Sequence, residues 1–442
     1  MGLLDDGCRG VHPEVMDVTA DPLSLLRERT SMKWRSFPAD VLPLFVAESD
    51  FPLAEPVQAA LIAAVTRSDT GYVAPVNGLG EAFSGFAARR WDWQVDPDQV
   101  TTTTDVSVAI VETLRMLIRP GDRVVITPPV YPPFFDLVPE AGGQVHAVPL
   151  LHGQTGWTLD LDGLEHAFQS GVRCVLLCNP HNPVGHPHTA EDLAALAGLA
   201  ARYAVTVVSD EVHAPLTYAD AAFTPYLTVS PAAADHGVCV TSASKAWNLA
   251  GLKCAAIVTA GERMRAELAA LPQEVSWRTS QLGLIAGIAA FRHGEPWLDG
   301  VIAALDINRR RLTDLLDVQL PEVGYRPPGA SYLAWLDLRN LGWGDDPALV
   351  ALEQARVALS PGPMFGKPGR GFARLNRLFA RGAHRGDLPA GRRRLGAHES
   401  RRAVRNDPEI SGRVVRSYLT VRRRYSASVV GCLDHDLHVV RV

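Results

Sequence analysis

The 442-residue sequence predicts an α/β protein with a mostly parallel β-sheet covered by helices on both faces, together with a smaller α+β domain. Three observations predict this fold. Short, continuously apolar runs alternate with stretches of helical periodicity between about residues 50 and 280, as in parallel sheets buried on both faces. Polar side chains follow several of these runs directly, where open α/β sheets bind ligands. After about residue 285 the pattern changes to a long helix and further strands.

The predicted elements follow one another along the chain. Branched aliphatic residues fill five short runs, which is typical of strands buried on both faces. We expect strands at 124–127, 172–178, 204–209, 238–241 and 255–259, with helical stretches at 106–118 and 189–203. The later part of the chain predicts a long helix at 297–316 and strands near 331–336 and 372–375.

These elements predict a division into domains. We expect an N-terminal segment (1–48) that belongs with the small domain, a large domain (49–285), a small domain (286–376) and a tail (377–442). A chain of this length is too long for one compact core, so two domains are the simplest arrangement.

Composition and charge argue against several classes of protein. With 21% charged residues and a net charge of −5, the chain has no overall basic field to attract nucleic acid. The sequence shows no signal segment and no apolar run of 18 residues, so we expect a cytoplasmic protein without a membrane anchor. The six cysteines lack CxxC pairs, which favours buried thiols over a metal site or disulfides.

Residues 377–442 differ in composition from the rest of the chain. They contain 15 arginines, no lysine and six acidic residues. Three interpretations are open: a basic arm for nucleic acid or anionic membrane, a disordered tail, and a segment translated in a shifted reading frame. We favour a frame shift after Asn376, with disorder as its physical consequence, because GC-rich DNA read out of frame encodes Arg-, Gly- and Pro-rich protein. Sequencing the encoding DNA tests this hypothesis.

The strongest local motif is Ser242-Ala243-Ser244-Lys245, followed eight residues later by Lys253. Two hydroxyls and an ammonium group that follow a buried strand suit a phosphate dianion. A lysine in such a cationic, partly buried place has a reason to lose its proton, which Schiff-base chemistry requires. An ordinary loop with solvated lysines explains the motif equally well when it is taken alone.

A second motif, Ser-Asp-Glu-Val-His at 209–213, follows an apolar strand 35 residues before Lys245. A carboxylate such as that of Asp210 can keep a pyridinium nitrogen protonated, so that the ring withdraws electrons from a substrate. Alternatively, Asp210 caps the next helix. Capping alone does not explain why the carboxylate lies near a predicted phosphate and lysine site.

Three further features are weaker by themselves. The two Asn-Pro steps at 179–183 force a tight turn, where Asn182 could direct its amide at a cofactor oxygen, although a plain loop is the alternative. The free amides of Val106 and Ser107 at a helix start form an anion site, whereas the Asp105 carboxylate would repel phosphate. Tyr131 could stack on a flat ring or be an ordinary aromatic.

One arginine of the second domain is a candidate for substrate binding. Arg374 lies on a predicted short strand, and a guanidinium group matches a carboxylate in a bidentate manner. A lone arginine is more often a surface charge.

In combination these motifs resemble those of fold-type I pyridoxal-phosphate (PLP) enzymes of the aminotransferase class I/II superfamily, and more closely the MalY/PatB-type cystathionine β-lyases. The resemblance covers about residues 21–376 and includes Lys33-Trp34-Arg35, the segments 42–48 and 50–52, and Gly71-Tyr72. It implies the PLP-dependent transferase-like fold, with a seven-stranded, mostly parallel sheet in the large domain.

The resemblance also implies a role for each matching residue. Lys245 would carry PLP as a Schiff base and move the Cα proton, Asp210 would pair with the pyridine nitrogen, and Arg374 would bind the substrate carboxylate. Asn182 would contact the ring oxygen and Tyr131 would stack on the ring. The phosphate would be held by Ser242, Ser244, Lys253 and the amides of Val106 and Ser107. Tyr72 would reach the phosphate of the neighbouring subunit, which implies a homodimer.

Two positions depart from the pattern of many aminotransferases. His213 stands where these enzymes have a tyrosine that contacts the ring oxygen, and the Asp-Glu-Val-His form resembles the lyase branch. The closing helix expected after Asn376 is absent from the sequence as written, which predicts exposed apolar surface and lower stability for the small domain.

The resemblance implies a carbon–sulfur β-lyase that releases thiol, pyruvate and ammonia from cystathionine or a cysteine S-conjugate. An aminotransferase with the same carbanion chemistry is the second hypothesis. A regulator with a PLP fold and no catalysis is the third, and the altered C-terminus adds weight to it. The presence of Lys245, Asp210 and Arg374 favours an enzyme.

Overall fold

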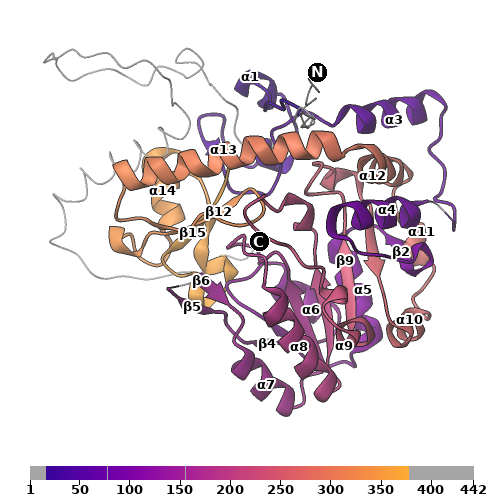
Figure 1. Ribbon diagram of the computed structural model, residues 1–442. Helices are drawn as coiled ribbons and strands as arrows, with labels where there is room; N and C mark the ends of the chain where they lie inside the picture. Colours follow the sequence, from indigo (N-terminus) through magenta and orange to yellow (C-terminus); the bar gives the residue numbers. More distant parts are fainter. Residues whose placement is uncertain (1–15, 77, 155, 378–442) are drawn as a thin grey trace, which may run out of the picture.

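The computed structural model describes residues 16–76, 78–154 and 156–377 (Figure 1). The Arg-rich tail and its interpretation as a shifted frame therefore lie outside the described residues from 378 onward. Two β-sheets dominate the described chain: one of seven strands and one of four. Among the described residues, no helix is long and apolar enough to cross a membrane.

The seven-stranded sheet has the predicted, mostly parallel arrangement. Strand β10 runs antiparallel to both of its neighbours, and the other pairs are parallel. The strands β7, β8 and β9 in the middle are buried along their whole length. The order is β2 (Val100–Thr103), β10 (Ala255–Val258), β9 (Gly237–Thr241), β8 (Thr206–Asp210), β7 (Cys174–Cys178), β3 (Arg123–Ile126) and β4 (Gln144–Ala147).

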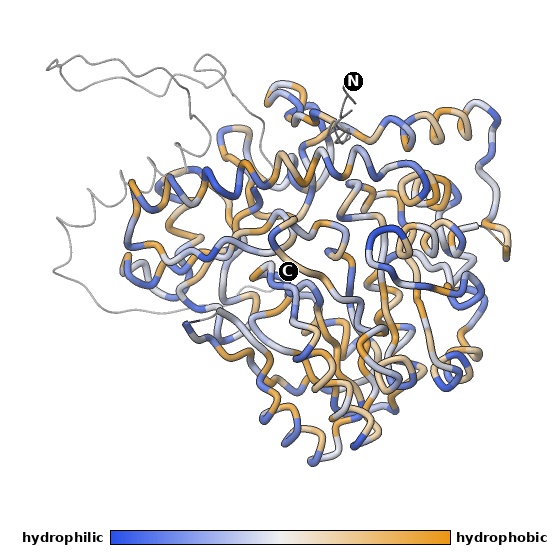
Figure 2. Tube along the Cα trace, viewed as in Figure 1, coloured by the Kyte–Doolittle hydropathy of each residue, from blue (hydrophilic) through white to orange (hydrophobic). Residues whose placement is uncertain are grey.

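Both faces of this sheet carry a hydrophobic core because alternate residues of a strand point to opposite sides. In β7, Val175 and Leu177 pack into one cluster, while Leu176 packs into the other. Helix α8 (Ala190–Arg202) contributes Leu193 to the first cluster, and helix α5 (Val106–Leu117) contributes Ile110 to the second. Figure 2 shows apolar residues along the strands and hydrophilic ones on the outer turns of the helices.

The bounds of the two predicted helices, α5 and α8, lie within one residue of those expected. Side chains cap the start of each helix. The Thr189 hydroxyl accepts a hydrogen bond from the Asp192 amide at the start of α8, over 3.1 Å. Asp105 accepts from the Val108 amide at the start of α5, over 2.9 Å. Such caps satisfy amides that have no partner within the helix.

The smaller sheet is antiparallel and packs against helices α13 (Glu295–Gln319) and α14 (Pro347–Ala355). Strand β12 begins two residues later than predicted because Ser331 has a φ of 69°, which a strand cannot contain. The order is β11 (Gly324–Tyr325), β12 (Leu333–Asp337), β15 (Phe372–Asn376) and β14 (Ser360–Pro361).

The division into domains stays a prediction. Strands β2 to β10 lie within the predicted large domain, and strands β11 to β15 lie within the small one. The N-terminal segment reaches the small domain through β1 (Leu42–Pro43), which pairs with β13 (Val357–Ala358). Arg377, which the prediction placed in the tail, is buried, and its amide donates to the Tyr332 carbonyl over 2.8 Å.

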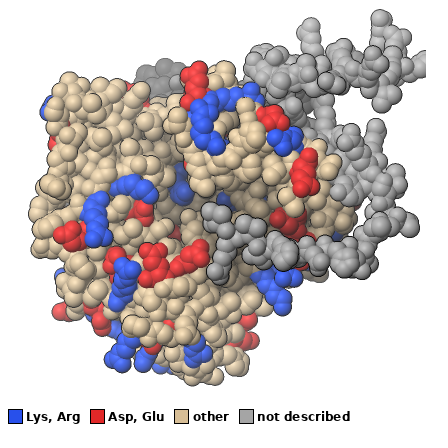
Figure 3. All heavy atoms as spheres, turned by 180° about the vertical axis from the view of Figure 1, so that it is seen from behind, with Lys and Arg blue, Asp and Glu red and all other residues tan. Residues whose placement is uncertain are grey.

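The charges on the described surface are mixed. On the face shown in Figure 3, basic and acidic side chains are interspersed over the part of the chain that is described.

Candidate active site

A cavity of about 230 Å³ lies at the carboxyl ends of β7, β8 and β9, next to strand β15. Eleven of the twelve predicted site residues line it: Val106, Ser107, Tyr131, Asn182, Asp210, His213, Ser242, Ser244, Lys245, Lys253 and Arg374. The twelfth, Tyr72, does not line it, and 94% of its surface is exposed in the single chain. The fold thus gathers residues that are up to 268 positions apart, from Val106 to Arg374.

Lys245 lies in the turn that follows β9. The Ser242 hydroxyl accepts from the Ser244 amide over 3.0 Å and donates to the Cys254 carbonyl over 2.7 Å, which orders this turn. The Lys245 amine donates to the Ala47 carbonyl over 3.3 Å. Burial and the nearby Arg374 guanidinium lower the pKa of this amine. A larger fraction of unprotonated amine makes a better nucleophile.

Asp210 ends strand β8 and is 4% exposed. One of its oxygens accepts from the Val212 amide over 3.2 Å. Burial raises the pKa of this carboxyl group to about 7, because the charged form loses its hydration. A cationic partner in the cavity would stabilise the carboxylate, and a protonated ring nitrogen is such a partner.

Hydroxyls, amides and one cation gather at another part of the cavity. Lys253 forms an ion pair with Asp105 over 2.8 Å, and both side chains are partly exposed. The sequence predicted that Asp105 would repel a phosphate; the ion pair offsets this repulsion, and Asp105 instead serves as the cap of α5. The start of α5 and the Ser242 turn together provide the donors that a phosphate group requires.

Arg374 is buried on strand β15, where it pairs with Ser360 of β14. Its guanidinium group donates to the Asn182 side-chain oxygen over 3.0 Å, and to the Phe45 carbonyl over 2.9 Å and the Ser360 hydroxyl over 3.0 Å. Arg374 is therefore not the surface charge that a lone arginine usually is. Its position beside Asn182 places a cation at the edge of the cavity.

His213 and Tyr131 complete the predicted set. A ring nitrogen of His213 (Nδ1) lies 3.0 Å from the Ser331 hydroxyl. Burial lowers the pKa of His213 to about 3, with Lys245 and Arg374 adding to the effect, so the imidazole is neutral. Burial also raises the pKa of Tyr131, so this phenol stays protonated.

Sequence reasoning missed several residues that contact this site. Val46, Ala47, Cys178 and Cys254 also line the cavity. The resemblance included residues 42–48 without assigning them a role. The Ala47 contact uses a backbone carbonyl, which every residue possesses, so no residue type in the sequence marks it.

The residues of the cavity fit pyridoxal phosphate. Asp210 suits the ring nitrogen, Lys245 suits an aldehyde carbon, and the donors near Lys253 suit the phosphate. The cavity has room for a small, flat cofactor, and it is partly open, so a substrate can enter.

Known proteins resemble this chain in sequence and in fold. The "Putative cystathionine beta-lyase" of Mycobacterium leprae (strain TN) is 44% identical over 386 residues, which are 81% of this chain and 94% of the relative. Cystathionine beta-lyase PatB of Bacillus subtilis (strain 168) is 35% identical over 340 residues, 76% of this chain and 88% of the relative. The crystal structure of a "putative plp-dependent beta-cystathionase" from Corynebacterium diphtheriae matches with a TM-score of 0.77 and 35% identity, and covers 81% of this chain and 94% of its own.

A family model provides the broadest comparison. The model for aminotransferase class I and II matches residues 45–377, a range that contains the whole cavity and the seven-stranded sheet. On the strength of this match and of the identity to its relatives, the chain belongs to the aminotransferase class I and II family.

Proposed function

We propose that the chain is a PLP-dependent carbon–sulfur β-lyase that cleaves cystathionine or a cysteine S-conjugate into a thiol, pyruvate and ammonia. The observation that carries this proposal is the placement of Lys245, Asp210 and Arg374 around one cavity in a member of this family. The names of the relatives add support, since both sequence relatives are called cystathionine β-lyases.

The proposed chemistry assigns a task to three residues. When bound, PLP withdraws electrons from the Cα of an attached amino acid and so makes its proton acidic. Lys245 would hold the cofactor through its Nζ atom, and its amine would accept the Cα proton of the substrate. Asp210 keeps the ring nitrogen protonated. Arg374 binds the substrate carboxylate and thereby directs the Cα–H bond toward the lysine.

The remaining predicted residues position the cofactor in this proposal. Ser242, Ser244, Lys253 and the amides of Val106 and Ser107 hold the phosphate. Asn182 contacts the ring oxygen, and Tyr131 stacks on the ring. His213 is neutral, so it contributes a hydrogen-bonding partner at the ring without adding charge.

We also propose that the enzyme is a homodimer in which Tyr72 reaches the phosphate of the neighbouring subunit. Its support is the exposed apolar surface near this residue: Ile62, Val65 and Val76 are 60%, 60% and 87% exposed. These three residues and Tyr72 lie within 15 positions of one another in the sequence, and exposed apolar patches mark surfaces that other proteins cover. The expected location in the cytoplasm stays a prediction from the sequence.

One assay separates the hypotheses. Purified protein is incubated with PLP and L-cystathionine, and the release of thiol and pyruvate is measured with and without a 2-oxo acid. We expect thiol and pyruvate without an acceptor. A strict requirement for the 2-oxo acid would identify an aminotransferase instead.

The same assay includes a control for the lysine. Lys245→Ala is expected to abolish turnover and the absorption band of the attached cofactor. Bound PLP without any turnover in the unchanged chain would favour the non-catalytic regulator. A band that survives in Lys245→Ala would place the attachment elsewhere.

A further inference from the structure

Segment 45–49 borders the cavity through Val46 and Ala47, and each of its five backbone carbonyls accepts a hydrogen bond from a side chain. The side-chain donors come from distant parts of the sequence, and the Val46 carbonyl also accepts from the Glu48 amide over 2.9 Å. The side-chain donors are Arg374 and Ser360 to Phe45, Asn376 to Val46, Lys245 and Tyr332 to Ala47, Asn376 and Lys33 to Glu48, and Arg29 and Asn248 to Ser49. Five consecutive carbonyls held in this way fix the path of a segment that has no sheet partner over these residues.

On one side, segment 45–49 is held by strand β15. The Asn376 side-chain amide donates to the Val46 carbonyl over 2.7 Å and to the Glu48 carbonyl over 2.9 Å. Asn376 is fully buried, and it contacts the carbonyls of the residues before and after Ala47. Strand β15 also carries Arg374, which holds Phe45.

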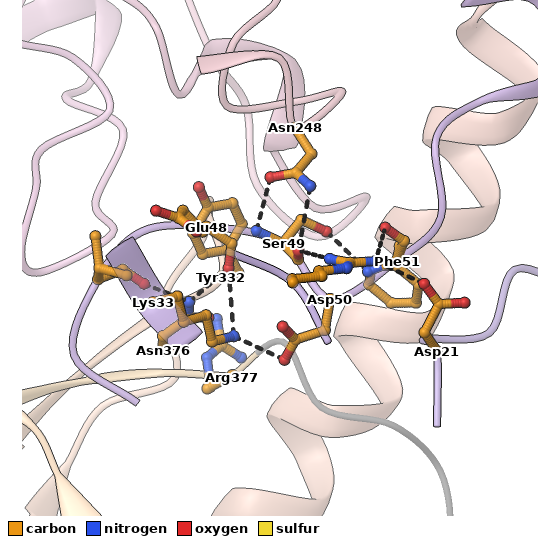
Figure 4. Close-up of polar contacts among 12 residues, drawn as sticks. Asp21, Lys33, Glu48, Ser49, Asp50, Phe51, Asn248, Tyr332, Asn376 and Arg377 are labelled. Atoms are coloured by element: carbon orange, nitrogen blue, oxygen red, sulfur yellow. Dashed lines mark hydrogen bonds and ion pairs between the residues drawn. The ribbon is translucent and has the colours of Figure 1, made fainter. Parts of the chain in front are cut away.

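On the other side, segment 45–49 is held by the turn that carries Lys245. Asn248 accepts from the Ser49 amide over 2.9 Å and donates to the Ser49 carbonyl over 3.2 Å, as a neighbouring strand would (Figure 4). Lys245 lies three residues earlier in the same turn and donates to Ala47. The segment is thus fastened to the lysine turn at two alternate residues.

A buried ion pair anchors the chain immediately after this segment. Lys33 contacts Asp50 over 2.7 Å, and their side chains are 1% and 4% exposed. Arg29 adds a second attachment because it donates to the Ser49 carbonyl and to the Asp21 carboxylate. The end of the segment therefore has little freedom to move.

We propose that Asn376 is a positioning residue for Lys245: by holding the carbonyls on both sides of Ala47, it presents the Ala47 carbonyl to the lysine amine. Segment 45–49 then connects the proposed carboxylate-binding residue, Arg374, with the proposed attachment residue, Lys245. This inference rests on the function proposed above, to which it adds a residue that touches neither substrate nor cofactor.

The contact has a definite electrostatic consequence. A carbonyl oxygen that accepts from an amine stabilises its charged form, so the Ala47 contact opposes the effect of burial on Lys245. The other charges that act on this amine are those of Arg374 and Lys253, which disfavour the ammonium form, and those of Asp210 and Glu48, which favour it. If segment 45–49 is loosened, Lys245 loses a stabilising acceptor while these charges remain.

The test measures the reactivity of one amine in the full-length chain. Protein freed of PLP is treated with an acetylating reagent over a range of pH, and the acetylation of Lys245 is quantified by mass spectrometry. Only the unprotonated amine reacts. We expect Asn376→Ala to move the midpoint of the profile down by about one pH unit, which raises the reactive fraction below the midpoint about tenfold.

Two further variants keep the test decisive. Asn248→Gly removes the second fastening, and glycine accepts the positive φ of 60° at this position, so the backbone is undisturbed. We expect the midpoint of the acetylation profile to move down in Asn248→Gly as well. This variant provides the test if Asn376→Ala does not fold. Asn308→Ala is the matched control: this residue donates to the Arg377 carbonyl and makes no contact with segment 45–49 that the structure shows.

The outcomes separate this inference from the proposed function. The positioning role would be overturned if folded Asn376→Ala kept the midpoint unchanged. If Asn376→Ala does not fold, an unchanged midpoint in Asn248→Gly would have the same meaning. An equal shift in the control, Asn308→Ala, would also overturn the role. Added PLP should protect Lys245 from acetylation in the unchanged chain. Lack of protection would contradict the proposed attachment of PLP to Lys245, while leaving the midpoint shift as a separate result.

Discussion

Replacing Lys33 by methionine would leave the Asp50 carboxylate buried without the cation that it contacts. Lys33 and Asp50 are 1% and 4% exposed, and 2.7 Å separates the ammonium nitrogen from the carboxylate oxygen. Methionine keeps most of the volume of the lysine side chain, so the main change is the lost charge. Breaking a buried ion pair on one side costs about 3–5 kcal/mol of unfolding free energy, because the remaining charge has no compensation.

The loss of stability depends on pH in a predictable direction. Burial raises the pKa of Asp50 above its ordinary value, and Lys33 opposes this effect. Without Lys33 the pKa in the folded state rises further, so the folded variant binds a proton more tightly than the unfolded chain. The loss of unfolding free energy in Lys33→Met is therefore smallest below about pH 4. It grows as the pH rises through the raised pKa of Asp50.

Urea unfolding, followed by circular dichroism at about pH 5 and about pH 8, measures both effects. The matched control is Arg115→Met, which breaks an exposed pair with Glu112 on helix α5 and should cost less than about 1 kcal/mol. Two results would refute the reasoning: a loss in Lys33→Met as small as in the control, or a loss that does not grow with pH. Replacing Lys33 and Asp50 together by apolar residues should recover much of the stability, since no charge remains buried.

Three further predictions concern the cavity. Asp210→Asn should lower kcat by roughly 10² or more, because an amide cannot keep the ring nitrogen protonated, and steady-state kinetics with saturating PLP would show it. Arg374→Lys should raise KM for the amino-acid substrate about tenfold or more, with the cofactor absorption unchanged, because a lysine cannot form the bidentate contact; an unchanged KM would remove Arg374 from substrate binding. Lys253→Met should raise the Kd of PLP about tenfold, whereas Asp105→Asn should not raise it through charge, since this variant removes a negative charge near the phosphate. Equilibrium dialysis of both variants measures the two Kd values, and an equal rise in both would contradict the prediction.

Local sequence patterns predicted several of the strands and helices. The run at 172–178 predicted strand β7, since continuous apolar residues fit a strand buried on both faces, and the structure confirms it from Cys174. The strands β8 and β9 and helix α8 were likewise within about two residues of their predicted bounds. These elements depend on interactions between residues near in sequence and on burial that is uniform along the element. Strand β12 was predicted two residues too early because a left-handed serine has no sequence signature.

The residue types also predicted the chemistry of the site, because lysine, aspartate, serine and arginine differ in charge and in the hydrogen bonds they donate or accept. Local motifs pointed to Lys245 and Asp210, whereas only the resemblance to the family pointed to Arg374. Lys245 and Asp210 meet at one cavity because the parallel strands bring their ends to the same edge of the sheet, whereas Arg374 reaches the cavity from strand β15 of the smaller, antiparallel sheet. The sequence alone did not reveal that Lys253 is paired with Asp105, since 148 residues separate them.

The tertiary structure alone decided how segment 45–49 is held. Lys245 donates a hydrogen bond to Ala47, which lies 198 positions away in the sequence, and Asn376 donates to Val46, which lies 330 positions away. The acceptors in both contacts are backbone carbonyls, which are the same in every residue and leave no trace in the order of side chains. Residue types therefore determined which groups are available for chemistry, while the packing of two sheets determined which carbonyl faces the reactive amine.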